Sequence, residues 1–329
     1  MSDSIEVSVL LPFHRVDEYL YSAINSCLNS IDCRIEIVLI DTRDNNKVPK
    51  LQLNNQSEHV VRNINAPGAS YYSALKQGLE FASSRYIALM NSDDLISKVR
   101  FKLQLDRLKE SQSDLCVTDM RKFSRKIENK LPSILGEIRY NNFSPHFLLL
   151  GAYWANATWL FLKDWAIEND VFEEVGEFSD WKSALRTFPK TRIVWIREEL
   201  YYYRLHKLQT TKKGNPDTAQ LQKCLIQLNQ NLGLPNLTGL EHLILAGVIR
   251  PRILRTEIIN RKTSLMLWRK AIIEKLCTTD NERVEFTSIF ERRLIIYSLF
   301  SLRGVQFRHP KLLLQILRDA AKLGRRLRW

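Results

Sequence analysis

Short apolar runs alternate with amphipathic segments over the first 120 residues, and this alternation limits the folds open to the chain more than any other feature. The strand-like runs are residues 6–11, 35–40, 86–90 and 115–117. Between them, apolar residues recur at helical spacing in residues 18–28, 67–83 and 97–110. A chain in which strands and helices take turns forms a parallel sheet with helices packed on it. The sequence therefore predicts an α/β fold with a doubly wound, mostly parallel sheet.

The chain changes character towards its C-terminus. A helix is expected around residues 180–188 and a strand at 192–196. After the polar stretch KLQTTKKGNPD (207–217), which is typical of a domain boundary, the pattern is a succession of helices. We therefore expect an α/β domain over residues 1–211 and a helical, basic C-terminal domain over residues 212–329.

The net charge of +13 is unevenly distributed. Residues 236–329 carry 19 Lys and Arg against 8 Asp and Glu, whereas residues 1–235 carry 30 against 28. Near the end, residues 310–329 place Leu and Ala on one helical face and Lys and Arg on the other. Such a basic amphipathic helix either lies on an anionic membrane surface or packs on its own domain with its charges solvated. A basic excess also suits nucleic acid, but no nucleic-acid motif accompanies it, so no such partner is expected.

The cysteines and the apolar stretches indicate in which cellular compartment the protein is expected. The five Cys residues include no CxxC pair and no neighbouring His cluster, so neither a disulfide framework nor a zinc site is indicated. No uninterrupted apolar stretch reaches the roughly 18 residues that a membrane-spanning helix needs. The first residues lack the basic and apolar regions of a secretion signal. We therefore expect a cytoplasmic protein, either free or peripheral on the inner face of the cytoplasmic membrane.

Acidic residues stand at the ends of several expected elements. Asp41 and the pair Asp93-Asp94 each follow a strand, and Asp180 opens a helix. Adjacent carboxylates at a strand end provide oxygen ligands for Mg²⁺ or Mn²⁺, which in turn hold the phosphates of a nucleotide. On spacing alone, Asp41 could be a turn residue, and Asp180 could be a helix N-cap. The pair Asp93-Asp94 could be a solvated turn or a helix N-cap preceding Ser97.

Five segments, in this order, resemble the family 2 glycosyltransferases, which are inverting enzymes with the Rossmann-like GT-A fold that use nucleotide-activated sugars. The segments are IEVSVLLPFH (5–14) with the helix after it, EIVLID (36–41), YIALMNSDD (86–94), SDWKSALR (179–186) and YYRLH (202–206). The resemblance runs from about Glu6 to about Thr211. It implies that residues 1–211 are a GT-A glycosyltransferase domain.

The resemblance also implies a role for individual residues. Asp180 would be the catalytic base, which removes a proton from the acceptor hydroxyl as that oxygen attacks the anomeric carbon. Asp93, Asp94 and His206 would bind Mn²⁺ or Mg²⁺, which neutralises charge on the departing diphosphate. The implied donor-binding residues are Pro12, His14, Asp41, Thr42, Lys76, Ser92 and Asp93.

The expected function follows from this resemblance. The chain would be a metal-dependent, inverting glycosyltransferase of the hexosyltransferase type. It would use a nucleotide-sugar donor and a hydroxyl of a glycan or lipid-linked acceptor, in cell-surface polysaccharide or glycolipid synthesis. The basic C-terminal helices would then contact an anionic membrane surface.

Several positions depart from the family pattern. Thr42 replaces the second aspartate of a base-binding pair, Asn91 occupies the first position of the DXD-type motif, and Ser179 replaces an acidic residue. His14-Arg15 stands in place of a Tyr-Asn pair, and Leu75-Lys76 in place of an Arg-Asn pair. These departures leave open a GT-A-like protein that has lost catalysis and only binds a sugar or a partner. The retained carboxylates favour the enzyme.

Overall fold

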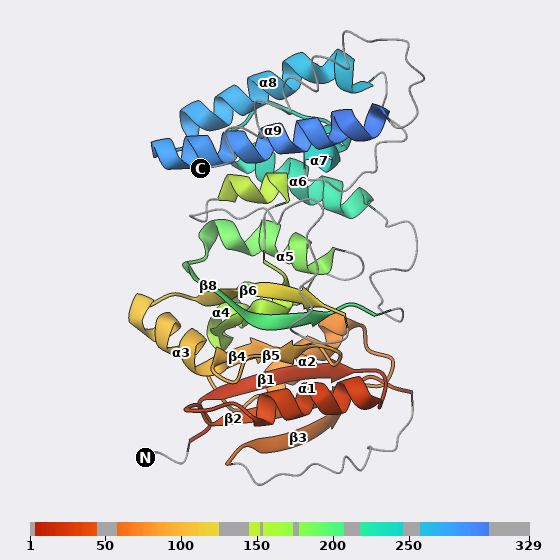
Figure 1. Cartoon of the computed structure of the whole chain (residues 1–329), viewed down its shortest axis with the longest axis vertical. Coiled ribbons are helices and arrows are strands. Elements are labelled where there is room, and N and C mark those ends of the chain that lie inside the picture. The colour runs from red at the N-terminus through yellow and green to blue at the C-terminus, as the bar shows by residue number, and fades with distance from the viewer. Residues whose placement is uncertain are drawn as a thin grey trace. The chain divides into compact units, whose positions relative to one another are not determined.

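The computed structural model describes residues 4–44, 58–124, 145–151, 154–173, 178–206, 218–245 and 257–302 (Figure 1). The chain divides into two compact units. The first comprises residues 1–135 and 154–216, and the second comprises residues 136–153 and 217–329. The second unit thus takes in a segment from the middle of the chain, which no sequence pattern indicates. The expected basic helix at 310–329 and the polar stretch at 207–217 lie outside the described residues.

In its described residues, the first unit contains an eight-stranded sheet with the order β3-β2-β1-β4-β7-β6-β8-β5. The strands are β1 (Val7–Phe13), β2 (Ile35–Asp41), β3 (Val60–Asn65), β4 (Tyr86–Leu89), β5 (Leu95–Ile96), β6 (Leu115–Phe123), β7 (Leu160–Leu162) and β8 (Ile193–Arg204). β1 is parallel to β2 and β4, β2 to β3, and β6 to β8. β7 and β5 are antiparallel to their neighbours. The predicted α/β fold with a mostly parallel sheet is confirmed.

Helices pack on both faces of this sheet. The helical elements of the first unit are α1 (Glu18–Leu28), α2 (Tyr71–Phe81), α3 (Arg100–Ser111), η2 (Asn156–Thr158), α4 (Lys163–Glu168), α5 (Ser179–Thr187) and η3 (Phe188–Lys190). Apolar residues of α1 and α3 share one core with Val9 of β1. The adjacent Leu10 points to the opposite face, where α2 approaches so closely that a Cβ on Gly78 would lie 2.5 Å from Ile40. The sheet is therefore doubly wound, as predicted.

The centre of the sheet is buried on both sides. Every residue of β1 and β2 is buried, as expected for parallel strands covered by helices. The polar exceptions are paired. Glu36 accepts hydrogen bonds from the Ser8 hydroxyl and from the backbone N–H and hydroxyl of Ser83. These two strands can therefore hold their carboxyl ends, and the residues that follow, in fixed positions.

The sequence does not predict three of the strands, β3, β5 and β7. β5 has two residues and β7 has three, which is too short for a periodic pattern. β3 is an edge strand with no buried residue, so its sequence lacks the apolar run that marks the central strands. β8 extends beyond the expected strand at 192–196 to Arg204, because its second half continues to pair with β6 and also pairs with β5.

The second unit is helical, which confirms the expected helical C-terminal region. Its elements are η1 (Pro145–Leu150), α6 (Ala219–Asn231), α7 (Gly239–Leu245), α8 (Glu257–Lys275) and α9 (Asp280–Leu302). Trp268 of α8 packs on Phe286 and Phe290 of α9, and its indole N–H donates to the Asn229 side chain at 2.6 Å. Within the described ranges, no helix combines the length and the apolar character needed to cross a membrane.

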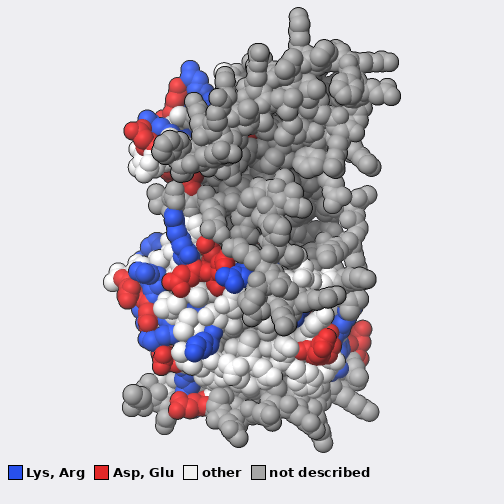
Figure 2. Space-filling view, viewed as in Figure 1, with Lys and Arg blue, Asp and Glu red and all other residues white. Residues whose placement is uncertain are grey.

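Positive and negative side chains are mixed on the first unit. On the face drawn in Figure 2, Lys and Arg lie among Asp and Glu. Among the ion pairs of the first unit are Arg121 with Glu199 at 2.6 Å and Arg192 with Asp114 at 2.7 Å. This mixture matches the near balance of charge in residues 1–235.

His242 of α7 offers a test of stability in the second unit. Its side chain is fully buried, and neither ring nitrogen has a hydrogen-bond partner in the described part of the chain. Burial lowers the pKa of His242 to about 4. The unfolded histidine takes up a proton below about pH 6.5, so folding stability is complete above that pH and is lost towards pH 4.

We expect His242→Leu to raise the free energy of unfolding at neutral pH by about 1 kcal/mol, because an apolar side chain replaces an unsatisfied polar one. The variant should also lose less stability on acidification. Urea unfolding at neutral pH and at about pH 5 measures both effects. A variant that unfolds at lower urea than the wild type at neutral pH, and keeps the wild-type decline in acid, would contradict this expectation.

Candidate active site

The acidic motif lies between β4 and β5. Asp94 is fully buried, and its carboxylate accepts hydrogen bonds from the Tyr201 hydroxyl (2.7 Å) and the Arg204 backbone N–H (2.8 Å). The Asn91 side-chain amide donates a third bond at 3.0 Å. Burial, together with the charge of Asp93, raises the pKa of Asp94 to about 7. Asp94 therefore faces the protein and ties the motif to β8.

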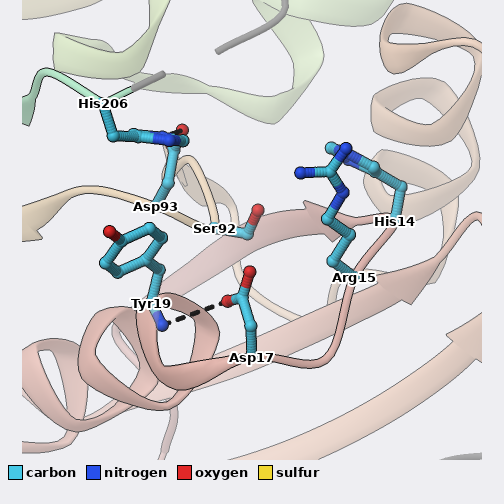
Figure 3. Close-up of a pocket in the computed structure, with 7 residues that line it drawn as sticks. All are labelled: His14, Arg15, Asp17, Tyr19, Ser92, Asp93 and His206. Atoms are coloured by element: carbon cyan, nitrogen blue, oxygen red, sulfur yellow. Dashed lines mark hydrogen bonds and ion pairs between the residues drawn. The ribbon is translucent and has the colours of Figure 1, made fainter. Parts of the chain in front are cut away.

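Asp93 lies at the surface of a pocket (Figure 3). Its Oδ2 is 2.9 Å from Nε2 of His206, and its backbone carbonyl accepts a hydrogen bond from Nε of Arg204 at 2.8 Å. The Arg204 guanidinium lies 4.7 Å from the ring centroid of Tyr19 and 4.8 Å from that of Phe123. Two aromatic faces thus hold this arginine in place. The end of β8 thereby brings together Asp93 and His206, two of the predicted metal ligands.

The pocket opens at the carboxyl ends of β1 and β4. Its lining residues are His14, Arg15, Asp17, Tyr19, Ser92, Asp93 and His206. Figure 3 shows His14 and Arg15 on one side, Asp93 with His206 on the other, and Ser92 and Asp17 between them. Asp17 caps α1 by accepting the backbone N–H groups of Tyr19 and Leu20. The carboxyl edge of the strands is where open α/β sheets bind ligands.

Asp41 and Thr42 stand at the end of β2. Asp41 is buried, and its carboxylate binds the Arg43 guanidinium at 2.7 and 2.9 Å. The Thr42 hydroxyl donates to the Phe13 carbonyl at 3.0 Å. Because Phe13 of β1 is in register with Asp41, His14 lies beside these residues. The structure therefore gathers three of the predicted donor-binding residues at one edge.

The other predicted donor-binding residues are spread more widely. Ser92 lines the pocket next to Asp93. Pro12 is buried within β1, in register with Ile40, and supports the strand end. Lys76 is exposed on α2 and is not among the residues that line the pocket.

Asp180 is the second residue of α5 and is partly buried. The N-cap of this helix is Phe178, which has a left-handed φ of 58° and whose side chain makes no capping hydrogen bond. Asp180 instead accepts the backbone N–H of Trp181 at 2.8 Å. The N-cap alternative is therefore wrong for Asp180. Desolvation raises the pKa of Asp180, and a carboxylate with a raised pKa is a better proton acceptor.

A buried arginine braces the acidic motif. Arg100 of α3 is fully buried, and it donates to the backbone carbonyls of Leu89 (3.2 Å) and Ala157 (2.8 Å). Its guanidinium lies 5.0 Å from the ring centroid of Tyr201. Burial lowers the pKa of Arg100 to about 10, so it keeps its charge at neutral pH. Since Leu89 ends β4 and Tyr201 holds Asp94, Arg100 supports the motif on both sides.

The sequence analysis does not identify several residues that shape this site. They are Asp17, Tyr19, Tyr71, Arg100 and Tyr201, while Arg15 and Arg204 appear in the sequence analysis only as members of the segments at 14–15 and 202–206. Asp17 has a signal, because an Asp directly before an amphipathic segment is typical of an N-cap. The tyrosine-rich run 201–203 is a weaker signal for Tyr201. Arg100 has none, because arginine is rarely buried.

GT-A proteins have a doubly wound sheet with an acidic motif at a strand end, as this chain does. The sequence model described as Glycosyl transferase family 2 matches residues 8–176, about half of the chain, and includes the acidic motif. The chain belongs to glycosyl transferase family 2. The resemblance seen in the sequence is confirmed.

A solved structure is similar to this chain in fold. The crystal structure of S. aureus TarS 1-349 in complex with UDP-GlcNAc has a TM-score of 0.53 at 14% identity, over 97% of this chain and 89% of that chain. At this identity the likeness shows the fold alone, which is GT-A.

Two curated relatives match at low identity. The minor teichoic acid biosynthesis protein GgaB of Bacillus subtilis (strain 168) is 24% identical over 251 residues, which is 70% of this chain and 27% of GgaB. Glycosyltransferase GlyG of Streptococcus pneumoniae serotype 4 is 21% identical over 217 residues, which is 60% of this chain and 70% of GlyG. The chain thus spans about a quarter of the length of GgaB.

Proposed function

We propose that this chain transfers a hexose from a nucleotide-diphosphate sugar to a hydroxyl of a glycan or lipid-linked acceptor, with inversion at the anomeric carbon. The observation that carries the proposal is the Asp93–His206 pair. Both side chains line the pocket at the carboxyl ends of β1 and β4. Membership of family 2 supports the reaction class. The description of GgaB as a teichoic acid biosynthesis protein supports a role in cell-surface polymer synthesis.

A divalent cation, Mn²⁺ or Mg²⁺, fits the Asp93–His206 pair in part. The pair offers one carboxylate oxygen and one imidazole nitrogen, donors that Mn²⁺ accepts. In the residues that the structure describes, no group of three or more His, Cys, Asp or Glu could hold a metal by itself. Diphosphate oxygens and water would complete the coordination, as is usual for such ions. When bound, the cation would offset the charge that develops on the departing diphosphate.

Asp94 takes a different role in this proposal. The sequence predicts Asp94 as a second metal ligand, but its carboxylate is fully buried and already accepts three hydrogen bonds. We propose that Asp94 holds the acidic motif against β8, so that Asp93 and His206 face the cation.

Asp180 acts as the general base in this proposal. It accepts the proton of the acceptor hydroxyl while that oxygen attacks the anomeric carbon, and its raised pKa suits this task. The nucleoside end of the donor lies along the ends of β1 and β2, beside His14, Asp41 and Thr42. Ser92 contacts the diphosphate, Pro12 supports the strand end, and Lys76 is the least supported contact because it lies outside the pocket.

We place this reaction in the cytoplasm, at the inner face of the cytoplasmic membrane. The support is the excess of 19 Lys and Arg over 8 Asp and Glu in residues 236–329. Each basic residue near an anionic surface adds about 1 kcal/mol of attraction. A lipid-linked acceptor would be presented at the same surface.

Release of nucleoside diphosphate tests the proposal. The assay presents UDP-GlcNAc and a panel of other nucleotide-sugars, with lipid extract as acceptor, in Mn²⁺, in Mg²⁺ and in EDTA. We expect release that requires the cation. It should fall by on the order of 100-fold in Asp93→Asn, because the variant loses the negative charge that holds the cation at the departing diphosphate. The matched control is Asp106→Asn, an exposed carboxylate on α3 that pairs with Lys102.

Two other outcomes of this assay would argue against the proposed function. Donor binding without release for any nucleotide-sugar would favour the alternative of a catalytically inactive sugar-binding protein. Binding of none of these donors would overturn the proposed function.

A further inference from the structure

Tyr71 reaches the acidic motif from α2, whereas Tyr201 and Arg204 reach it from β8. It is the first residue of α2, directly after the N-cap Ser70. Its hydroxyl donates a hydrogen bond to Oδ1 of Asn91 at 3.0 Å. The side chain is 37% exposed, whereas its neighbour Tyr72 is 2% exposed. Tyr71 is thus a surface tyrosine whose hydroxyl is fixed at the motif.

Asn91 explains how this hydroxyl is oriented. Its side-chain oxygen accepts from Tyr71, and its side-chain nitrogen donates to Asp94 at 3.0 Å. An aspartate at this position has no proton to donate and would face the buried Asp94 with a second negative charge. The asparagine therefore suits its place, although the family pattern has an aspartate there. It links Tyr71 to the motif through one amide group.

Tyr71 also lies within electrostatic reach of the proposed base. Desolvation of the hydroxyl, followed by the charges of Asp180, Asp94 and Asp93, raises the pKa of Tyr71. The hydroxyl therefore keeps its proton at neutral pH. In the proposed reaction the transferred sugar must lie between the base and the diphosphate. Tyr71 meets the acidic motif through Asn91, and the charge of Asp180 acts on its hydroxyl.

We propose that Tyr71 is a specificity-determining residue that hydrogen-bonds a hydroxyl of the transferred sugar. This inference rests on the proposed function. The single proton of the Tyr71 hydroxyl is donated to Asn91, and the Asn156 side chain donates to the Tyr71 oxygen. The remaining lone pair of that oxygen can accept an O–H of the sugar. A sugar with its hydroxyl at that place gains this hydrogen bond, and one with the opposite configuration does not.

Calorimetric titration of Tyr71→Phe tests this inference. The matched control is Tyr72→Phe, which removes a neighbouring hydroxyl that meets the Asn156 side chain at 3.4 Å. The probes are UDP-GlcNAc, UDP-glucose and GDP-mannose, each beside UDP or GDP, in Mn²⁺. We expect Tyr71→Phe to bind the nucleotide-sugar about tenfold more weakly, as for one lost hydrogen bond, with unchanged affinity for the nucleoside diphosphate. Tyr72→Phe should match the wild type in both.

The other outcomes separate this inference from the proposed function. Equal binding of nucleotide-sugar by Tyr71→Phe and wild type overturns the role of Tyr71 alone. An equal loss for nucleotide-sugar and nucleoside diphosphate also overturns it, because it would show a structural effect through Asn91. A wild-type protein that binds none of the nucleotide-sugars overturns the proposed function, and this inference falls with it.

Discussion

Asp180→Asn is expected to reduce sugar transfer by about 1,000-fold, because a general base contributes on the order of 100- to 10,000-fold to such reactions. The amide cannot take the proton of the acceptor hydroxyl. It can still accept the backbone N–H of Trp181 through its side-chain oxygen, so α5 should remain intact. Donor affinity should be unchanged, since the role proposed for Asp180 concerns the acceptor. Product release under saturating donor, together with calorimetric donor binding, measures the two effects.

Asp164→Asn is the matched control for this experiment. Asp164 also lies in the first turn of a helix, α4, and is exposed. The same chemical change there should leave transfer at the wild-type rate. If Asp180→Asn retains more than about a tenth of the wild-type rate, Asp180 is not the general base.

Arg100→Met is expected to lower the free energy of unfolding by about 3 kcal/mol or more, because it removes a buried charged donor. The carbonyls of Leu89 and Ala157 would lose hydrogen bonds of 3.2 and 2.8 Å. Tyr201 would lose the guanidinium that packs on its ring. Urea denaturation of the whole chain measures the change.

Lys102→Met on the same helix is the comparison. Its ammonium pairs with Asp106 at 2.7 Å, and both side chains are about two-fifths exposed. A pair of this kind contributes roughly 0–1 kcal/mol. Equal losses in the two variants would show that Arg100 is not a brace for the motif.

The sequence predicts the long, fully buried strands of the sheet better than its short strands. The runs at 6–11 and 35–40 become β1 and β2, because strands buried on both faces need continuous apolar residues. β7 and β5 add three and two residues to the sheet through pairing with distant strands, which no local pattern records. The division of the chain into units also depends on such distant contacts.

The sequence predicts which residue types form the site, but it does not predict which way their side chains face. The motif at 93–94 and the element ending in His206 are both visible in the sequence, and the structure joins them through the Asp93–His206 contact. Which carboxylate of the pair faces the pocket depends on the bonds from Tyr201 and Arg204, which come from a strand about 110 residues away. Sequence spacing alone cannot distinguish Asp93 from Asp94.

The second unit is built from two separate segments of the chain, and this affects how it folds during synthesis. Phe147, Leu148, Leu149 and Leu150 of η1 are all fully buried, and η1 contacts α6, α7 and α9. These apolar residues leave the ribosome before the helices that bury them have been synthesised. Their side chains must therefore remain exposed without aggregating, or be shielded by a chaperone, until the C-terminal helices emerge. A chain cut after residue 216 would keep these four side chains and lose their partners, so we expect such a fragment to aggregate.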